Sequence, residues 1–140
     1  MVLAKLTKKA LRVHQTGQES LEGTPHTVSL HHIIYTMKRE AFKMYLKPGC
    51  EEEYKRRHAA LWPEMRQLLS EGGVYDYSIF WDRDTNILFA VQKVSGDENS
   101  QDMGYNPVVQ RWWDNNADIM EVNPDNSPVS IPLEEVFRME

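Results

Sequence analysis

The sequence predicts an α+β fold of the ferredoxin-like type, β-α-β-β-α-β, over residues 37–140. The order in which strand-like and helix-like segments follow one another predicts this fold. Segments that alternate apolar and other residues occur singly, then as a pair, then singly again, with helical spacing between them. With 140 residues, 41% of them hydrophobic and 26% charged, the composition is that of one soluble globular domain.

Alternation with a period of two residues predicts the strands. The first strand covers residues 38–46, where Phe42 and Met44 alternate with their neighbours. Two central strands, at residues 74–81 and 87–94, are separated by polar turn residues and should form a hairpin. The final strand is predicted over residues 133–139.

Helical spacing predicts the other elements. Over residues 51–69, acidic side chains fill the first turn, apolar ones recur every three or four residues, and a Gly-Gly pair ends the helix. Pro63 interrupts this helix because proline has no backbone N–H, so we expect a kink or a break at Trp62. A second helix is predicted over residues 107–120, with Pro107 in its first turn.

Both helices should cover the same face of the sheet, which leaves the other face bare. Tyr45, Tyr77, Ile79 and Trp81 are too apolar for a face in full contact with water. Packing of sheet against sheet in a homodimer is therefore the simplest expectation. The alternative is that these side chains line an open cleft in a monomer.

Charge and composition exclude several classes of function. The formal net charge of -5 argues against a general nucleic-acid surface. No apolar run approaches the roughly 20 residues that cross a bilayer, so no membrane partner is expected. The single cysteine, Cys50, excludes an internal disulfide and suits a reducing compartment, which predicts a cytoplasmic protein.

Residues 1–36 differ in character from the rest of the chain. Residues 17–25 form a polar stretch typical of a linker, and residues 1–16 carry basic residues without acids, as in a weak targeting segment. We expect residues 1–36 to be a disordered extension or the product of a mis-assigned start at which Met37 is the true first residue. They also hold four histidines, namely His14, His26, His31 and His32, and the adjacent pair His31-His32 has no acidic or cysteine partner at ligand spacing nearby.

His58 is the candidate for proton transfer. It is the one histidine within residues 37–140, and histidine is the residue type whose ordinary pKa lies near neutrality. Tyr54 lies four residues earlier, so both side chains project from the same helical face. Spacing alone leaves open whether His58 is catalytic or structural, because a histidine on an apolar stripe is more often structural.

Trp112 and Trp113 are candidates for ligand binding. Neighbours on a helix point about 100° apart, so one indole could fill the core while the other borders a cleft. Indoles stack on the C–H faces of sugars and offer an N–H donor. Taken alone, the pair is more often explained by two core side chains at a helix–sheet interface. Tyr77 could add a hydroxyl donor from the sheet.

Five segments carry a wider pattern: Tyr54-Lys55-Arg56-Arg57-His58, Leu61-Trp62-Pro63-Glu64, Tyr77-Ser78-Ile79, Gln110-Arg111-Trp112-Trp113 and Asn123-Pro124-Asp125-Asn126-Ser127-Pro128-Val129-Ser130. In this order and at this spacing, from about residue 38 to residue 139, they resemble the L-rhamnose mutarotase family. The Asn-Pro-Asp-Asn-Ser-Pro loop is the most specific of them. Residues 1–36 lie outside the resemblance.

The resemblance implies a dimeric α+β barrel. It also implies an isomerase of the aldose 1-epimerase type that interconverts α- and β-L-rhamnopyranose in rhamnose metabolism, without a cofactor or metal. Ala59-Ala60 stands where the family usually has Asn-Pro, which alters the approach to Pro63 but removes no proposed catalytic group. The residues to which the resemblance assigns roles are His58 as proton donor and Tyr54, Tyr77, Trp112 and Trp113 as sugar-binding residues.

The chemistry of mutarotation suits these residue types. A proton leaves the anomeric hydroxyl, another reaches the ring oxygen, the ring opens to the aldehyde, and closure on the other carbonyl face gives the second anomer. Acid–base catalysis by one placed group contributes about 10²–10⁴-fold, and no metal or nucleotide is needed. The sequence does not identify the opposing base, for which the candidates by chemistry alone are Asp76, Glu64 and Asp125.

Two other functions remain open from the sequence. Related ferredoxin-like dimers include haem-binding proteins and monooxygenases, in which His58 would be an axial ligand or a base. A non-catalytic sugar-binding module would use the same aromatic residues without depending on His58. Fold analogy alone would not choose among these, so the choice of L-rhamnose depends on the family resemblance.

Overall fold

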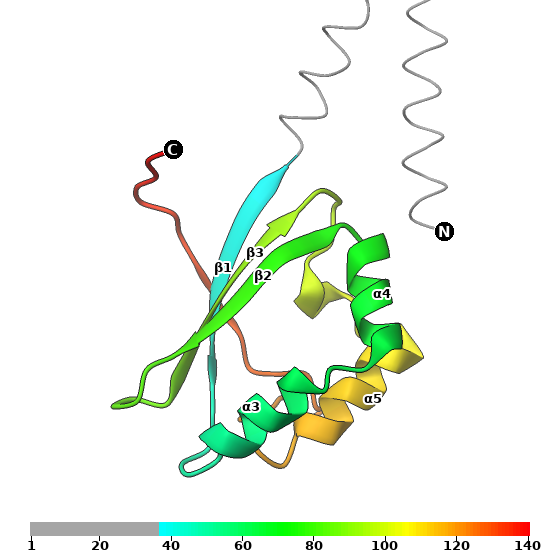
Figure 1. The fold of residues 1–140 in the computed structure, drawn as a ribbon, viewed down its shortest axis with the longest axis vertical. Helices are drawn as coiled ribbons and strands as arrows, with labels where there is room; N and C mark the ends of the chain where they lie inside the picture. The colour runs from blue at the N-terminus through cyan, green and yellow to red at the C-terminus, as the bar shows by residue number, and fades with distance from the viewer. Residues whose placement is uncertain (1–36) are drawn as a thin grey trace, which may run out of the picture. The chain divides into compact units, whose positions relative to one another are not determined.

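The computed structural model describes residues 37–140, which form a four-stranded sheet with helices against it (Figure 1). The strand order in the sheet is β2-β3-β1-β4, and β-α-β-β-α-β is the observed sequence of elements, as predicted. A single 3₁₀ turn, Ser100–Asp102, lies between β3 and the last helix. The elements are β1 (Lys38–Tyr45), α3 (Glu51–Ala59), α4 (Pro63–Glu71), β2 (Val74–Trp81), β3 (Ile87–Val94), α5 (Pro107–Asn116) and β4 (Ile131–Leu133).

Pro63 divides the first helical segment into two helices, as the sequence predicts. Pro63 is the first residue of α4, where its missing N–H costs nothing. Trp62 before it is extended, with φ -57° and ψ 132°, because the proline ring disfavours helical geometry in the preceding residue. The short link between the helices lets α3 and α4 point in different directions along the sheet (Figure 1).

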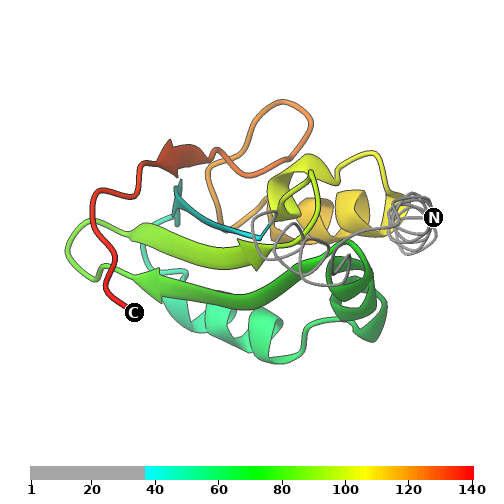
Figure 2. The same cartoon turned by 90° about the horizontal axis from the view of Figure 1, so that it is seen from above.

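The core lies between the sheet and the helices, which occupy one face of it (Figures 1 and 2). Along β1, Phe42, Met44 and Leu46 are buried, and they pack with Leu88 and Ala90 of β3 in one apolar cluster. A second cluster joins α4, the start of β2 and α5, and its buried members are Met65, Leu69, Val74, Met103, Val109, Trp112 and Trp113.

A β-bulge in β2 decides which of its side chains face the helices. Tyr75 pairs with Lys93 and Ser78 with Val91, so Asp76 and Tyr77 both lie opposite a single residue of β3. Asp76 has a φ of 46°, in the left-handed region that aspartate tolerates better than most residues. The bulge shifts the alternation by one residue from that point onward.

The expectation that Tyr77, Ile79 and Trp81 lie on the bare face is therefore wrong. Ile79 and Trp81 pair with the buried residues Ala90 and Leu88, and they pack with Tyr77 against the core cluster on the helix side. The part of the alternative that places these three side chains in a cleft is confirmed, because all three line a cavity. Among the four residues of that expectation, only Tyr45 alternates away from the buried face of β1.

The chain after residue 116 also departs from the prediction. Helix α5 ends at Asn116 rather than near residue 120, and Met120 instead forms an isolated bridge with Leu46. The last strand is Ile131–Leu133, not residues 133–139, and it pairs antiparallel with β1. Pro132 within it has no N–H to donate, which suits an edge strand. Charged Glu134 and Glu135 follow, and residues 134–140 have no regular structure.

The proposal of a disordered extension or mis-assigned start at residues 1–36 lies outside the described residues, as do the four histidines within it.

Arg57 joins the helix that carries His58 to the end of α5. Its guanidinium donates to the backbone oxygen of Asn115 at 2.6 Å and to both carboxylate oxygens of Asp118 at 2.7 and 3.0 Å. Its Nε donates to Glu53 at 2.8 Å within α3. The Arg57 side chain is only 16% exposed, so these bonds are better shielded from water than most surface ion pairs.

We expect Arg57→Lys to lower the melting temperature by about 4–8 °C, the shift that about 1 kcal/mol produces in a domain of this size. Lysine keeps the charge but cannot reach these acceptors in a planar fork. Arg56→Lys is the matched control, because within residues 37–140 the Arg56 side chain bonds only Glu53, and it is 70% exposed. Equal shifts in the two variants by differential scanning calorimetry would show that the link between α3 and α5 is unimportant.

Candidate active site

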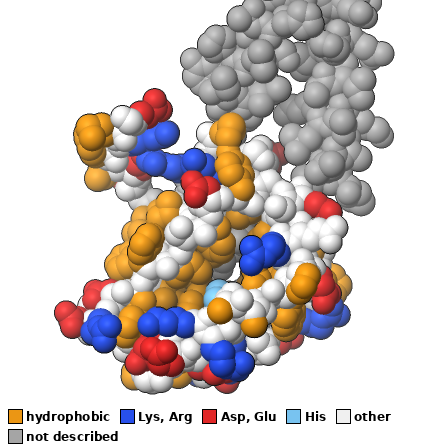
Figure 3. All heavy atoms as spheres, viewed as in Figure 1, with side chains coloured by type: hydrophobic (Ala, Val, Ile, Leu, Met, Phe, Trp, Pro, Cys, Tyr) orange, Lys and Arg blue, Asp and Glu red, His pale blue; other side chains and the backbone are white. Residues whose placement is uncertain are grey.

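A cavity of about 900 Å³ lies between the sheet and the helices. The space-filling view shows it as a hollow with a histidine side chain inside, and His58 is the one histidine among residues 37–140 (Figure 3). Its wall is largely apolar, with polar groups at a few positions, which is the usual character of a small-molecule site. The structure brings all five predicted site residues to this wall, namely Tyr54, His58, Tyr77, Trp112 and Trp113.

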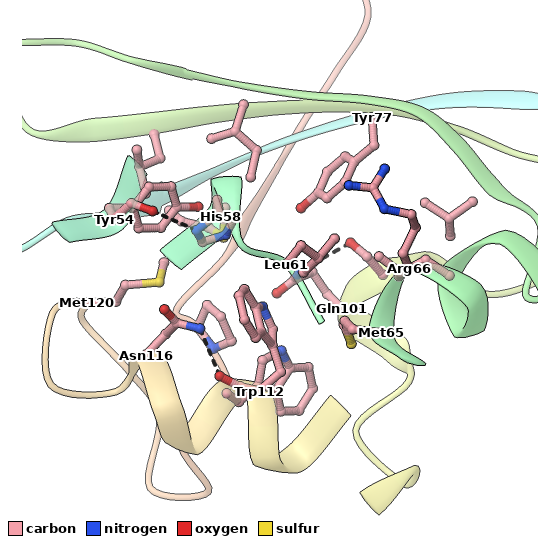
Figure 4. Close-up of a pocket in the computed structure, with 18 of the residues that line it drawn as sticks. Tyr54, His58, Leu61, Met65, Arg66, Tyr77, Gln101, Trp112, Asn116 and Met120 are labelled. Carbon is pink, nitrogen blue, oxygen red and sulfur yellow. Dashed lines mark hydrogen bonds between the residues drawn. The ribbon is translucent and has the colours of Figure 1, made fainter. Parts of the chain in front are cut away.

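Helix α3 holds Tyr54 and His58 against each other. They lie one turn apart, and their rings stack with centroids 3.9 Å apart and an interplanar angle of 24°. The Nδ1 of His58 is 3.0 Å from the backbone oxygen of Tyr54 (Figure 4). A carbonyl oxygen can only accept, so Nδ1 carries a proton and, in the neutral ring, Nε2 has the free lone pair.

Burial favours the neutral form of His58. It lowers the pKa of His58 below its ordinary value of 6.5, because a charged imidazolium would lose hydration, and the bond to the Tyr54 carbonyl opposes this only in part. His58 is therefore neutral near pH 7. A neutral imidazole with one free nitrogen can accept a proton there and return it.

The tryptophans complete the wall opposite the sheet. The ring of Trp112 packs in T-shaped geometry against the rings of His58 and Trp62, with centroids 5.2 Å and 5.1 Å apart. Contacts from two sides thus fix the indole in place. Trp113 is 6% exposed and packs so closely on Gly104 that a Cβ there would lie 2.3 Å from the indole. Both indoles are thus more than nine-tenths buried, and both also border the cavity.

Two tyrosines present hydroxyl groups in this apolar setting. Burial raises the pKa of Tyr77 to about 12, and burial likewise raises the pKa of Tyr54 well above its ordinary value. Both phenols stay protonated at any physiological pH. They can therefore act as hydrogen-bond donors, but not as bases.

The structure separates the three candidates for an opposing base. Asp76 lines the cavity, although its carboxylate is largely exposed and lies 3.1 Å from Lys93. Glu64 and Asp125 do not line it: Glu64 lies 3.7 Å from Arg111, and Asp125 accepts from Ser127. Only Asp76 of the three is placed near the cavity.

The Asn-Pro-Asp-Asn-Ser-Pro loop supports α5 from outside the cavity. Gln110 donates to the backbone oxygen of Asp125 at 2.7 Å, and Asn126 donates to Asp114 at 3.0 Å. Asn126 has a φ of 67°, which asparagine adopts more readily than most residues. The far end of the loop, Pro128, reaches the cavity wall. The loop thus positions the helix that carries the tryptophans.

Several cavity residues were not predicted from the sequence. Asn116 lies one turn after Trp112 on α5, so its place on the same face was available from helical spacing. Gln101 lies in the 3₁₀ turn between β3 and α5, which is too short for a periodic pattern to indicate the direction of the side chain. Arg66 on α4 also borders the cavity, with its guanidinium on the side of Tyr77 (Figure 4).

Within residues 37–140, no group of three or more His, Cys, Asp and Glu side chains could hold a metal ion. No helix in the same range combines the length and apolar character that crossing a membrane requires.

Comparisons with known proteins agree on one family. A family model described as L-rhamnose mutarotase matches residues 39–139. The L-rhamnose mutarotase of Phocaeicola vulgatus is 74% identical over 104 residues, which are 74% of this chain and 100% of that protein. The L-rhamnose mutarotase of Bacteroides thetaiotaomicron is 70% identical over 104 residues, with the same coverage. The crystal structure of L-rhamnose mutarotase FA22100 from Formosa agariphila has a TM-score of 0.69 and 61% identity, covering 74% of this chain and 99% of that one.

The lowered pKa of His58 predicts a pH dependence of stability. Below about pH 6.5 the unfolded chain binds a proton at this position that the folded protein does not, so stability falls as pH decreases through the folded pKa. Above pH 6.5 this contribution is fully present. The free energy of unfolding, measured by urea denaturation between pH 5 and 8, should therefore decrease more steeply with acidification in the wild type than in His58→Gln. Parallel curves for the two proteins would contradict the burial argument.

Proposed function

The chain belongs to the L-rhamnose mutarotase family, and we propose that His58 transfers the protons by which it interconverts the α and β anomers of L-rhamnose. The enzyme is an isomerase, and the comparisons favour this function over the haem-binding and monooxygenase alternative. The observation that carries the role of His58 is its free Nε2, held by the bond from Nδ1 to Tyr54 on the wall of the cavity.

His58 can serve both proton transfers of ring opening. The anomeric oxygen and the ring oxygen are bonded to the same carbon, so one imidazole can reach both in turn. The neutral Nε2 accepts the anomeric proton as the C1–ring oxygen bond breaks, and the imidazolium then donates that proton to the ring oxygen as the aldehyde forms. Rotation about C1–C2 and the reverse transfers close the ring on the other face. In this scheme His58 acts first as the base and then as the proton donor, and no separate carboxylate base is needed.

The aromatic residues would bind the sugar and exclude water. The indole of Trp112 borders the cavity beside His58, and indole faces pack against sugar C–H groups. Tyr54 and Tyr77 keep their phenolic protons and can donate to sugar oxygens. We assign Trp113 to the same wall, where its close packing on Gly104 holds the end of the cavity in place.

Replacing His58 tests its role directly. In His58→Ala, catalysed exchange between the α and β anomers of L-rhamnose should fall by about 10²–10⁴-fold, the usual contribution of one acid–base group. Magnetisation-transfer NMR near pH 7 measures this exchange with and without enzyme. His58→Gln, which fills the same space, separates chemistry from packing. Retention of wild-type exchange in both variants would exclude His58 as the proton-transfer group.

A homodimer that covers the outer face of the sheet is the second part of the proposal. Phe80 is 65% exposed and Val91 is 38% exposed on the face of β2 and β3 that points away from the helices. Ile131 and Leu133 pair with outward residues of β1 and extend the same apolar surface. The segment after β4 adds further exposed apolar side chains, namely Val136, Phe137 and Met139. Contact with a second copy is the arrangement that removes this surface from water.

The cytoplasm is the compartment proposed for the protein, because its single cysteine, Cys50, is free.

Sedimentation equilibrium should give twice the mass of the chain. Val91→Lys should shift the protein toward monomer at micromolar concentration, because a buried lysine without a partner opposes association. Tyr105→Lys is the matched control, since Tyr105 is 70% exposed on the loop before α5. A wild-type monomer, or a Val91→Lys dimer of unchanged stability, would refute this interface.

A further inference from the structure

Three buried polar atoms in the wall of the cavity have no hydrogen-bond partner in the part of the chain that the structure describes. Among residues 37–140, the buried side-chain polar atoms without a hydrogen-bond partner are the Tyr75 hydroxyl, the Gln101 Oε1 and the Asn116 Oδ1. All three residues line the same cavity. Buried polar atoms are normally paired, and leaving one unpaired is costly. Their gathering around one cavity indicates that a bound molecule supplies the missing partners.

Asn116 is the most constrained of these residues. It is 5% exposed at the end of α5, and its Nδ2 donates to the backbone oxygen of Trp112 at 2.8 Å. Rotating the amide by half a turn would place its oxygen against that carbonyl oxygen, which also only accepts, so the hydrogen bond fixes which atom faces which way. The Oδ1 consequently points away from the α5 backbone, on the side of Met120 (Figure 4).

We propose that Asn116 determines specificity by accepting a hydrogen bond from a hydroxyl group of the sugar through Oδ1. The inference rests on the proposed function, since it takes L-rhamnose as the molecule in the cavity. A fixed, neutral acceptor needs a donor, and the hydroxyls at C2, C3 and C4 are the donors of this sugar that do not react. The helical spacing of Asn116 and Trp112 places the acceptor next to the indole that covers the sugar.

The amide is suited to discrimination rather than to proton transfer. It does not titrate, so it contributes the same acceptor at every pH. A site that pairs a substrate hydroxyl rejects an analogue that lacks it, because the protein atom is then buried without a partner. The Trp112 carbonyl holds the amide in position before the sugar arrives, so little ordering remains to be done on binding.

The test pairs a variant with substrate analogues. Asn116→Leu removes the acceptor at similar volume, and KM and kcat for anomer exchange are measured by NMR for L-rhamnose and for analogues lacking the hydroxyl at C2, C3 or C4. The wild type should lose about tenfold in kcat/KM with one of these analogues, the order expected for one hydrogen bond. Asn116→Leu should lose about tenfold with L-rhamnose and show no further loss with that same analogue.

Controls keep the outcome interpretable. Asn115→Leu, on the exposed side of the same helix, should leave all four sugars unchanged. If Asn116→Leu does not fold, Asn116→Ala removes the same oxygen without adding apolar volume. Equal losses for every sugar in the Asn116 variants would assign the residue a structural role only, and unchanged kinetics would remove it from the site. Failure of the wild type to exchange the anomers of L-rhamnose would instead overturn the proposed function.

Discussion

The break at Pro63 is the constraint on which the site depends. A continuous helix from Glu51 to Glu71 would have one axis, so its two halves could not take the different directions that α3 and α4 have along the sheet (Figure 1). Proline at the first position of α4 prevents a continuous helix. In the link before it, Leu61 lines the cavity and Trp62 packs against the ring of Trp112. The same break leaves α3 as a short helix that must be held by its neighbours. Arg57 supplies that hold through Asp118 and the end of α5.

The bulge in β2 has a comparable effect on the sheet side. Strict alternation from Val74 would direct Tyr77, Ile79 and Trp81 away from the helices. The extra residue at Asp76–Tyr77 reverses this, so that both ends of the strand contribute to the helix side of the sheet. The aromatic residues that the sheet contributes to the wall, Tyr77 and Trp81, thus face the cavity because of one irregular backbone position. The bulge also places Phe80 on the other face, which Val91 of β3 shares, and this is the surface proposed for the second copy.

Local patterns predicted the fold well where a side-chain period or a proline determines the backbone. The first three strands, the helix break and the common face of Tyr54 and His58 follow from such patterns. The bulge did not, because a positive φ at a single aspartate has no periodic signal. The last strand was placed too late, because the apolar residues Val136, Phe137 and Met139 are typical of a strand, although no strand within residues 37–140 pairs with them. The site residues Asn116 and Gln101 were missed because their role depends on which polar atoms lack partners, and only three-dimensional packing reveals that.

The cavity combines two requirements that oppose each other. Burial keeps the His58 imidazole neutral with a free nitrogen, the form from which the proposed proton transfer starts. Sugar recognition needs polar atoms, which a dry cavity can hold only at a cost. The structure meets both by pairing one end of each polar group with the protein backbone, Nδ1 of His58 with Tyr54 and Nδ2 of Asn116 with Trp112. The other end, Nε2 or Oδ1, is left for the ligand. Because each backbone partner lies one helical turn before the side chain, two short helices suffice to orient both groups.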